Sequence, residues 1–287
     1  MTGVPADPSA PSTPPASPSR AGRNLPMAIG VGLGLGAILI VSLFTVRQIF
    51  VGVVVAAAVA SIWELKGTLL AARGIRISWI PLVVGTAATI VATWPWGHEA
   101  QIIGVVLTAL ACMVWRLPGG QDGYLRDVSA SIFVITYVGL FASFATLLVA
   151  PSDGHFRVLT FIIVVVCSDT GGYIAGVLFG KHPMAPKISP KKSWEGFSGS
   201  VLTAMIGGAL SVSLMLDDPW WHGVVLGAVI AVVATLGDLI ESMIKRDIGV
   251  KDMGTLLPGH GGVMDRMDSL LPSAVVAWLL LTALAAI

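Results

Sequence analysis

The chain is poor in charge. Only 33 of its 287 residues are Lys, Arg, Asp or Glu, whereas 55% are hydrophobic and the mean hydropathy is +0.86. A soluble domain carries about 25% charged residues, so this composition excludes an ordinary water-soluble globule. The net charge of +1 does not by itself indicate a partner, and we expect no nucleic acid to bind.

Cysteine and the familiar catalytic motifs are also scarce. Cys112 and Cys167 both fall inside apolar runs, and the sequence has no CxxC and no Cys/His ligand spacing. This excludes a disulfide framework and a zinc site, and we expect both cysteines to be small buried residues. The sequence contains no serine-hydrolase elbow, HExxH or P-loop, which argues against the enzyme classes built on those motifs.

Long apolar runs fill most of the chain. Segments of about 17 to 25 such residues are typical of transmembrane helices, so we predict an all-α integral membrane protein with about nine spans. The predicted spans are 26–45, 48–65, 78–96, 101–117, 130–150, 158–180, 197–216, 221–244 and 271–287.

The first 25 residues have a different composition, rich in Pro, Ser and Ala. They lack the apolar content to bury a core, and we expect a disordered cytoplasmic tail. Arg20 and Arg23 follow a long Pro-rich lead instead of opening the chain, so the first run is interpreted as an uncleaved helix and not as a signal peptide. Residues 26–287 then form one polytopic catalytic domain, with the site concentrated in 158–273.

The basic residues predict the orientation. With a cytoplasmic N-terminus and nine alternating helices, 15 of the 17 Lys and Arg residues fall on the cytoplasmic side, and Arg47 and Arg157 fall outside. This agrees with the positive-inside rule. We therefore expect a multi-pass plasma (inner) membrane protein with its C-terminus outside. Two cytoplasmic segments, 181–196 and 245–270, are the most polar.

Several acidic residues lie within or next to the predicted membrane spans, where burying a charge costs free energy. The spacing of Asp238, Glu241, Ser242 and Lys245 places all four on one helix face. Alone, each acid has a plainer explanation as a helix-end charge, which we adopt for Glu64 beside Lys66. As a set without Cys or His, they suit a hard cation such as Mg²⁺. The predicted metal ligands are Asp169, Asp238, Glu241, Asp265 and Asp268.

A basic segment precedes the seventh predicted helix. In "GKHPMAPKISPKKSWEG" (180–196), Lys187, Lys191 and Lys192 alternate with serines, and Ser193 is placed to cap the next helix. An ordinary positive-inside loop would have the same composition. The alternative is a phosphate clamp, because lysines bind phosphoryl oxygens as point charges. Clamp and acids together favour phosphoryl or nucleotidyl transfer, which requires mainly positioning and charge neutralisation.

The sequence of the most polar segment matches a known pattern. "SMIKRDIGVKDMGTLLPGHGGVMDRMDS" (242–269) resembles the signature of the phosphatidate cytidylyltransferases, which reads Ser-x-x-Lys-Arg, four residues, Lys-Asp, then Pro-Gly-His-Gly-Gly-x-x-Asp-Arg-x-Asp. "SDTGGYIAG" (168–176), "SPKKSWEG" (189–196) and "GDLIESMIKR" (237–246) are similar to other segments of that family, in the same order. The resemblance covers residues 158 to 273 and does not extend to the first five helices.

The resemblance implies an activity in phospholipid biosynthesis: CTP and phosphatidic acid give CDP-diacylglycerol and pyrophosphate. It also implies a membrane homodimer that needs Mg²⁺, with K⁺ as a second cation. The catalytic residues expected on this basis are Asp238, Lys251, His260, Asp265, Arg266 and Asp268. The expected substrate-binding residues are Lys187, Ser189, Lys191, Lys192, Glu195, Ser242, Lys245, Arg246, Gly261 and Gly262.

Two other functions fit parts of the same pattern. A CTP-dependent lipid kinase would share the cation, the nucleotide and the membrane, but it needs a general base for its hydroxyl substrate. A cation- or proton-coupled transporter also carries intramembrane acids. It would spread them over several helices near the midplane, whereas here they cluster at one face beside two basic segments.

Overall fold

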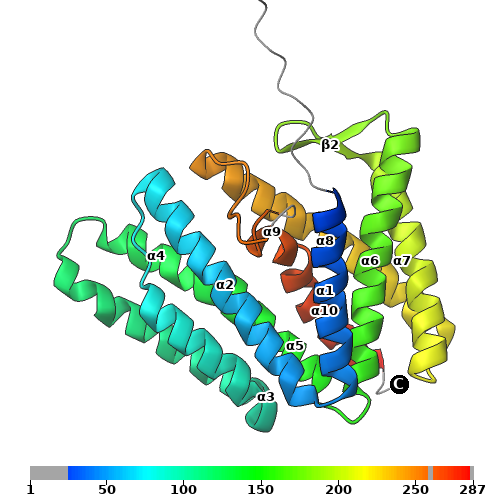
Figure 1. The fold of residues 1–287 in the computed structure, drawn as a ribbon, viewed down its shortest axis with the longest axis horizontal. Coiled ribbons are helices and arrows are strands. Elements are labelled where there is room, and N and C mark those ends of the chain that lie inside the picture. The colour runs from blue at the N-terminus through cyan, green and yellow to red at the C-terminus, as the bar shows by residue number, and fades with distance from the viewer. Residues whose placement is uncertain (1–24, 258–260, 285–287) are drawn as a thin grey trace, which may run out of the picture.

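The computed structural model describes residues 25–257 and 261–284, and nearly all of them are helical (Figure 1). The predicted tail lies outside these residues, apart from Leu25. The helices are α1 Leu25–Phe44, α2 Arg47–Arg73, α3 Trp79–Arg116, α4 Tyr124–Val134, α5 Phe141–Val149, α6 Gly154–Phe179, α7 Trp194–Met215, α8 Trp220–Ile248, α9 Met264–Met267 and α10 Leu270–Leu284. The order is completed by the 3₁₀ helix η1 Leu117–Gly119, the π-helical segment η2 Ile135–Leu140 between α4 and α5, and the strands β1 Pro183–Ala185 and β2 Ser189–Ser193.

The predicted class is confirmed as an all-α membrane protein. Over the described ranges, seven helical segments are long and apolar enough to cross a membrane, and the shorter apolar stretch Gly32–Phe44 lies in α1. The two-stranded antiparallel hairpin of β1 and β2 is the departure from a purely helical chain. It falls in the segment that we expected to be a loop.

Helix α3 contains two of the predicted spans. Its path is interrupted at Gly97, whose φ of 62° and ψ of −146° are not helical, a conformation that glycine adopts without a Cβ clash. A Cβ on Gly85 would overlap Thr108, and one on Gly104 would overlap Thr89. These crossed contacts mean that the two halves of α3 fold back on each other as an antiparallel pair.

The ends of α3 and α4 are tied together by Asp127. Its buried carboxylate accepts hydrogen bonds from the backbone N–H of Arg76 at 3.1 Å, from Arg116 Nε at 3.0 Å and from Arg126 Nε at 3.1 Å. Charge-assisted bonds of this kind are stronger than neutral ones. The segments 66–77 and 117–129 are therefore joined through one acidic side chain.

Helices α6, α7 and α8 pack closely because small residues line their contacts. A Cβ on Gly208 of α7 would overlap the carbonyl of Gly223 on α8, and one on Gly227 would overlap Ala204 of α7. In membranes, where the tails are as apolar as leucine, such small residues let helix backbones approach and pack. In Figure 1, α6 and α7 run side by side next to α1. The group of α6, α7 and α8 carries most of the site.

Candidate functional site

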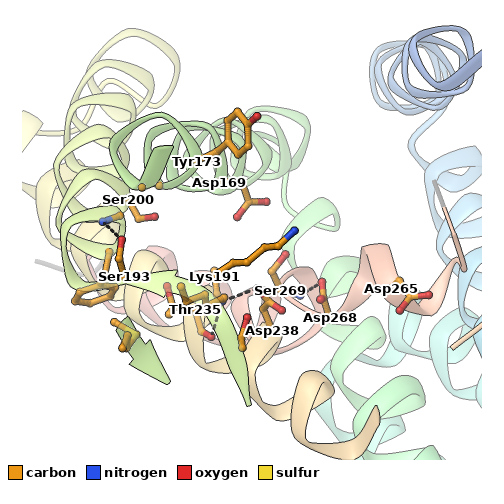
Figure 2. Close-up of a pocket in the computed structure, with 18 of the residues that line it drawn as sticks. Asp169, Tyr173, Lys191, Ser193, Ser200, Thr235, Asp238, Asp265, Asp268 and Ser269 are labelled. Carbon is orange, nitrogen blue, oxygen red and sulfur yellow. Dashed lines mark hydrogen bonds and ion pairs between the residues drawn. The ribbon is translucent and has the colours of Figure 1, made fainter. Parts of the chain in front are cut away.

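A cavity of about 550 Å³ opens between α6, the β1–β2 hairpin, the start of α7, α8 and α9 with the two residues after it (Figure 2). Charged and hydroxyl side chains dominate its wall. The polar lining residues are Asp169, Tyr173, Ser189, Lys191, Lys192, Ser193, Ser200, Thr235, Asp238, Lys245, Asp252, Asp265, Arg266, Asp268 and Ser269. Nine of the predicted site residues are among them, drawn from four separate stretches of sequence.

The hairpin delivers the basic side chains. Antiparallel pairing of Pro183 with Ser193 folds the strand that carries Ser189, Lys191 and Lys192 back over the cavity. Ser193 accepts a hydrogen bond from Gly196 N at 3.1 Å, so it caps α7 as the sequence predicted.

Glu195 has a structural position at the base of the hairpin. Its Oε2 accepts hydrogen bonds from the backbone N–H groups of Lys181 at 3.1 Å and His182 at 3.2 Å, and its Oε1 lies 2.5 Å from His182 Nδ1. The carboxylate thus fixes the point where the chain leaves α6 and enters β1. It does not line the cavity.

The acidic face of α8 forms as the helical spacing predicted. Ser242 Oγ lies 3.3 Å from Asp238 Oδ1, and Lys245 Nζ lies 2.5 Å from Glu241 Oε2. Asp238 faces the cavity, where its Oδ2 is 2.5 Å from Lys192 Nζ. Glu241 is fully buried behind the cavity wall. The face therefore divides into a cavity carboxylate and a buried ion pair.

Asp265 lies at the start of α9 and organises the segment before it. Its Oδ2 accepts hydrogen bonds from the N–H groups of Met253 and Gly262, each at 3.0 Å, and its Oδ1 accepts one from Lys245 Nζ at 2.9 Å. Gly261, next to Gly262, has a φ of 85°, which favours glycine. One carboxylate thus joins α8, the signature segment and α9.

Asp169 and Asp268 reach the cavity from different walls. In Figure 2, Asp169 projects from α6, while Asp238 and Asp268 lie across the space from it. Asp268 Oδ1 also accepts a hydrogen bond from Ser269 N at 2.7 Å. Within 25–257 and 261–284, no three Asp, Glu, His or Cys side chains group closely enough to hold a metal ion. The five predicted ligands therefore do not converge on one point.

Several other predicted site residues lie outside the cavity lining. Ser242, Gly261 and Gly262 are behind the wall, and Lys187 is exposed in the hairpin turn. Arg246 Nε lies 3.4 Å from the carbonyl oxygen of Ile188 and so supports that turn. His260 lies outside the residues that the structure describes.

Lys251 lines a second cavity. This space of about 870 Å³ lies between α2 and residues 248–256, and Asp252 lines both cavities. We expected Lys251 among the catalytic groups. It lines the second cavity and not the main one, which Lys245 and Arg266 line.

Sequence reasoning missed some residues that line the main cavity. Tyr173 lies four residues after Asp169 on α6, and Thr235 lies three before Asp238 on α8. Helical spacing from the acids places both on the acidic faces and could have identified them. Ser200, on α7, donates a hydrogen bond to the carbonyl oxygen of Ser168 at 2.8 Å, a contact that sequence spacing does not reveal.

The interpretation of Glu64 as a surface charge was wrong. The residue is only 6% exposed. Its Oε1 accepts a hydrogen bond from Leu256 N at 3.2 Å, and its Oε2 accepts one from Met264 N at 3.0 Å. The carboxylate is buried because it satisfies backbone donors of the signature segment, nearly 200 residues later in the chain.

Comparison with known proteins identifies the family. The model of the cytidylyltransferase family matches residues 27–284. A phosphatidate cytidylyltransferase of Mycobacterium leprae is 45% identical over 99% of this chain and 97% of its own length. One from Mycobacterium bovis is 45% identical over 93% and 91%, and one from Staphylococcus saprophyticus is 32% identical over 70% and 74%. The chain belongs to the cytidylyltransferase family.

Proposed function

We propose that this protein transfers a cytidylyl group from CTP to phosphatidate, giving CDP-diacylglycerol and pyrophosphate. The observation that carries this conclusion is the cavity, which brings Lys191 and Lys192 of the hairpin together with Asp169, Asp238 and Asp268. Relatives that bear the name phosphatidate cytidylyltransferase align over nearly the whole chain, so the substrates that this name states are assigned to the cavity.

The reaction needs no base from the protein. The phosphatidate phosphate is an anion at neutral pH, and its oxygen attacks the α-phosphorus of CTP. The new P–O bond forms as the bond between that phosphorus and the α,β-bridging oxygen of CTP breaks, and this oxygen leaves with the pyrophosphate. The protein must hold the attacking oxygen of phosphatidate, the α-phosphorus of CTP and the leaving oxygen of pyrophosphate in line. We assign Lys191 and Lys192 to the triphosphate. Lys245 of α8 and Arg266 of α9, which line the same cavity, are assigned to the lipid phosphate.

The acids of the cavity fit Mg²⁺ by their chemistry. Mg²⁺ is usually held by one or two carboxylates together with substrate phosphates and water, not by a cage of protein ligands alone. Asp238 and Asp268 are the carboxylates we assign, with Asp169 facing them. When bound there, Mg²⁺ would neutralise charge on the phosphates during the transfer. Asp265 and Glu241 are engaged with Lys245, and we assign them to positioning.

We also propose nine membrane crossings, with the N-terminus and the cavity in the cytoplasm of a plasma membrane protein. The antiparallel halves of α3 support two crossings in that helix. The distribution of Lys and Arg supports the orientation. The cavity then lies where CTP is available, at the depth of the lipid headgroups. We further propose the homodimer and the K⁺ site that the resemblance implies.

Purified protein should convert labelled CTP and phosphatidate to CDP-diacylglycerol and pyrophosphate, and only when Mg²⁺ is present. Removing Mg²⁺ with EDTA should abolish product formation, because three or more phosphate charges would remain unneutralised, and returning Mg²⁺ should restore it. Thin-layer chromatography of the lipid and an assay for pyrophosphate measure both products. Phosphorylated lipid with CDP would instead identify a kinase, and no product from either route would overturn the proposal.

The lysine clamp has its own test. Replacing Lys191 and Lys192 together with alanine should raise the KM for CTP by about tenfold or more, because two charge-assisted contacts to the triphosphate are lost. Lys187→Ala is the matched control, since that lysine belongs to the same hairpin but does not line the cavity. Initial rates measured against CTP and against phosphatidate separate the substrates. A change confined to phosphatidate dependence would contradict the clamp.

A further inference from the structure

Helix α2 contributes a pair of side chains that hold the signature segment from outside the main cavity. Glu64 accepts hydrogen bonds from the backbone N–H groups of Leu256 and Met264. One turn later on the same face, Thr68 Oγ1 donates a hydrogen bond to the carbonyl oxygen of Met253 at 2.6 Å. These two side chains therefore hold the signature segment at residues 253–256 and again at Met264.

Two glycines of the signature segment lie directly against the Glu64 carboxylate. A Cβ on Gly254 would overlap this carboxylate, and one on Gly262 would lie 2.7 Å from its Oε2 and 2.8 Å from Asp265 Oδ2. Both distances are far below ordinary van der Waals contact. A larger residue at Gly254 or Gly262 would collide with these carboxylates, so the packing requires glycine at both positions.

The contacts of α2 continue directly to Asp265. Met253 uses its carbonyl oxygen for Thr68 and its N–H for Asp265. Gly262 donates to Asp265, and Met264, two residues later, donates to Glu64. The backbone at 253–256 and at 262–264 is therefore held between two carboxylates, one on α2 and one at the start of α9.

We propose that Glu64 is a positioning residue for the transfer reaction, fixing residues 253–257 and 261–264 so that Asp265, Arg266 and Asp268 face the cavity. Glu64 does not line that cavity, so it acts through the backbone. A buried carboxylate is costly unless its oxygens are satisfied, and here both oxygens are used on the signature segment. This inference rests on the proposed function for its kinetic effect, but the anchoring itself does not.

The test begins with Glu64→Gln, which keeps the size of the side chain but turns an NH₂ group toward one of two backbone donors. We expect kcat to fall about tenfold or more, from the loss of a hydrogen bond to a charged group, with the KM for CTP unchanged because the hairpin is untouched. Glu99→Gln is the control, since Glu99 is an exposed glutamate at the bend of α3. Wild-type kcat in Glu64→Gln would overturn the proposal.

A second measurement reports anchoring without the reaction. Thr255 is exposed and can carry a spin label as Thr255→Cys in a background with Cys112→Ala and Cys167→Ala. Glu64→Gln should raise the mobility of the label in the electron paramagnetic resonance spectrum, and Glu99→Gln should not. Unchanged mobility would overturn the proposal, even if the wild-type protein proved inactive with CTP and phosphatidate. If Glu64→Gln does not fold, Thr68→Val must give the same two changes, smaller in size; without them the proposal fails.

Discussion

Replacing Asp238 by Asn is expected to lower kcat for CDP-diacylglycerol formation by roughly 100- to 1000-fold, the range found when one charge-stabilising group is removed from an active site. Asp238 faces the cavity with its Oδ2 2.5 Å from Lys192 Nζ. Asparagine keeps the shape but removes the negative charge. The variant therefore loses a proposed Mg²⁺ ligand and also the group that orients Lys192. Initial rates at saturating CTP and phosphatidate measure the effect.

Asp247→Asn provides the matched control for this prediction. Asp247 lies on the same helix, nine residues later, and is exposed. Its backbone carbonyl, which accepts from Arg73, is kept in the variant. We expect its turnover to stay within about twofold of wild type, as for most surface substitutions. If Asp238→Asn also turns over at that rate, with normal Mg²⁺ dependence, Asp238 has no part in the reaction.

Asp265→Asn is expected to lower kcat by about 100-fold, and for a different reason. Its two oxygens accept hydrogen bonds from Met253 N, Gly262 N and Lys245 Nζ. An asparagine has one oxygen, so in either orientation its NH₂ group faces a donor. Leaving buried donors unpaired costs about 1–3 kcal/mol each. We therefore expect the signature segment to lose its position beside the cavity, while membrane insertion stays intact.

The measurement for Asp265→Asn combines turnover with the amount of protein recovered in the membrane. Asp122→Asn serves as the control, because Asp122 is an exposed acid in the turn between α3 and α4. A variant that inserts normally and keeps wild-type kcat would remove Asp265 from any role in the site. A variant that inserts poorly would show that its contacts serve folding before they serve positioning.

The helical spacing of the sequence predicted which side chains share one face of a single helix. The face of α8 with Asp238, Glu241, Ser242 and Lys245 follows from spacings of three and four residues, and the structure confirms it. The cap at Ser193 was predicted on equally local grounds. These predictions succeeded because helix geometry alone fixes which neighbours meet.

Contacts between distant segments could not be predicted in this way. Glu64 looked like a charge at a helix end, because its partners Leu256 and Met264 are backbone groups nearly 200 residues away. Lys251 looked like its basic neighbours, yet the turn at Asp252 places it in the other cavity. Backbone donors carry no sequence signature, and the side of a turn on which a lysine emerges depends on the fold.

The bonds between α2 and the signature segment have a consequence for synthesis in the cell. Glu64 is translated early, but its two donors lie 192 and 200 residues later. Contacts of such long sequence separation form late, because a long loop must close before they add any stability. Until the start of α9 emerges, this carboxylate lacks the second of its two native donors, Met264 N. The cavity is therefore completed only by the last helices to be made, and a nascent chain that stops before α9 has inserted helices but an unfinished site.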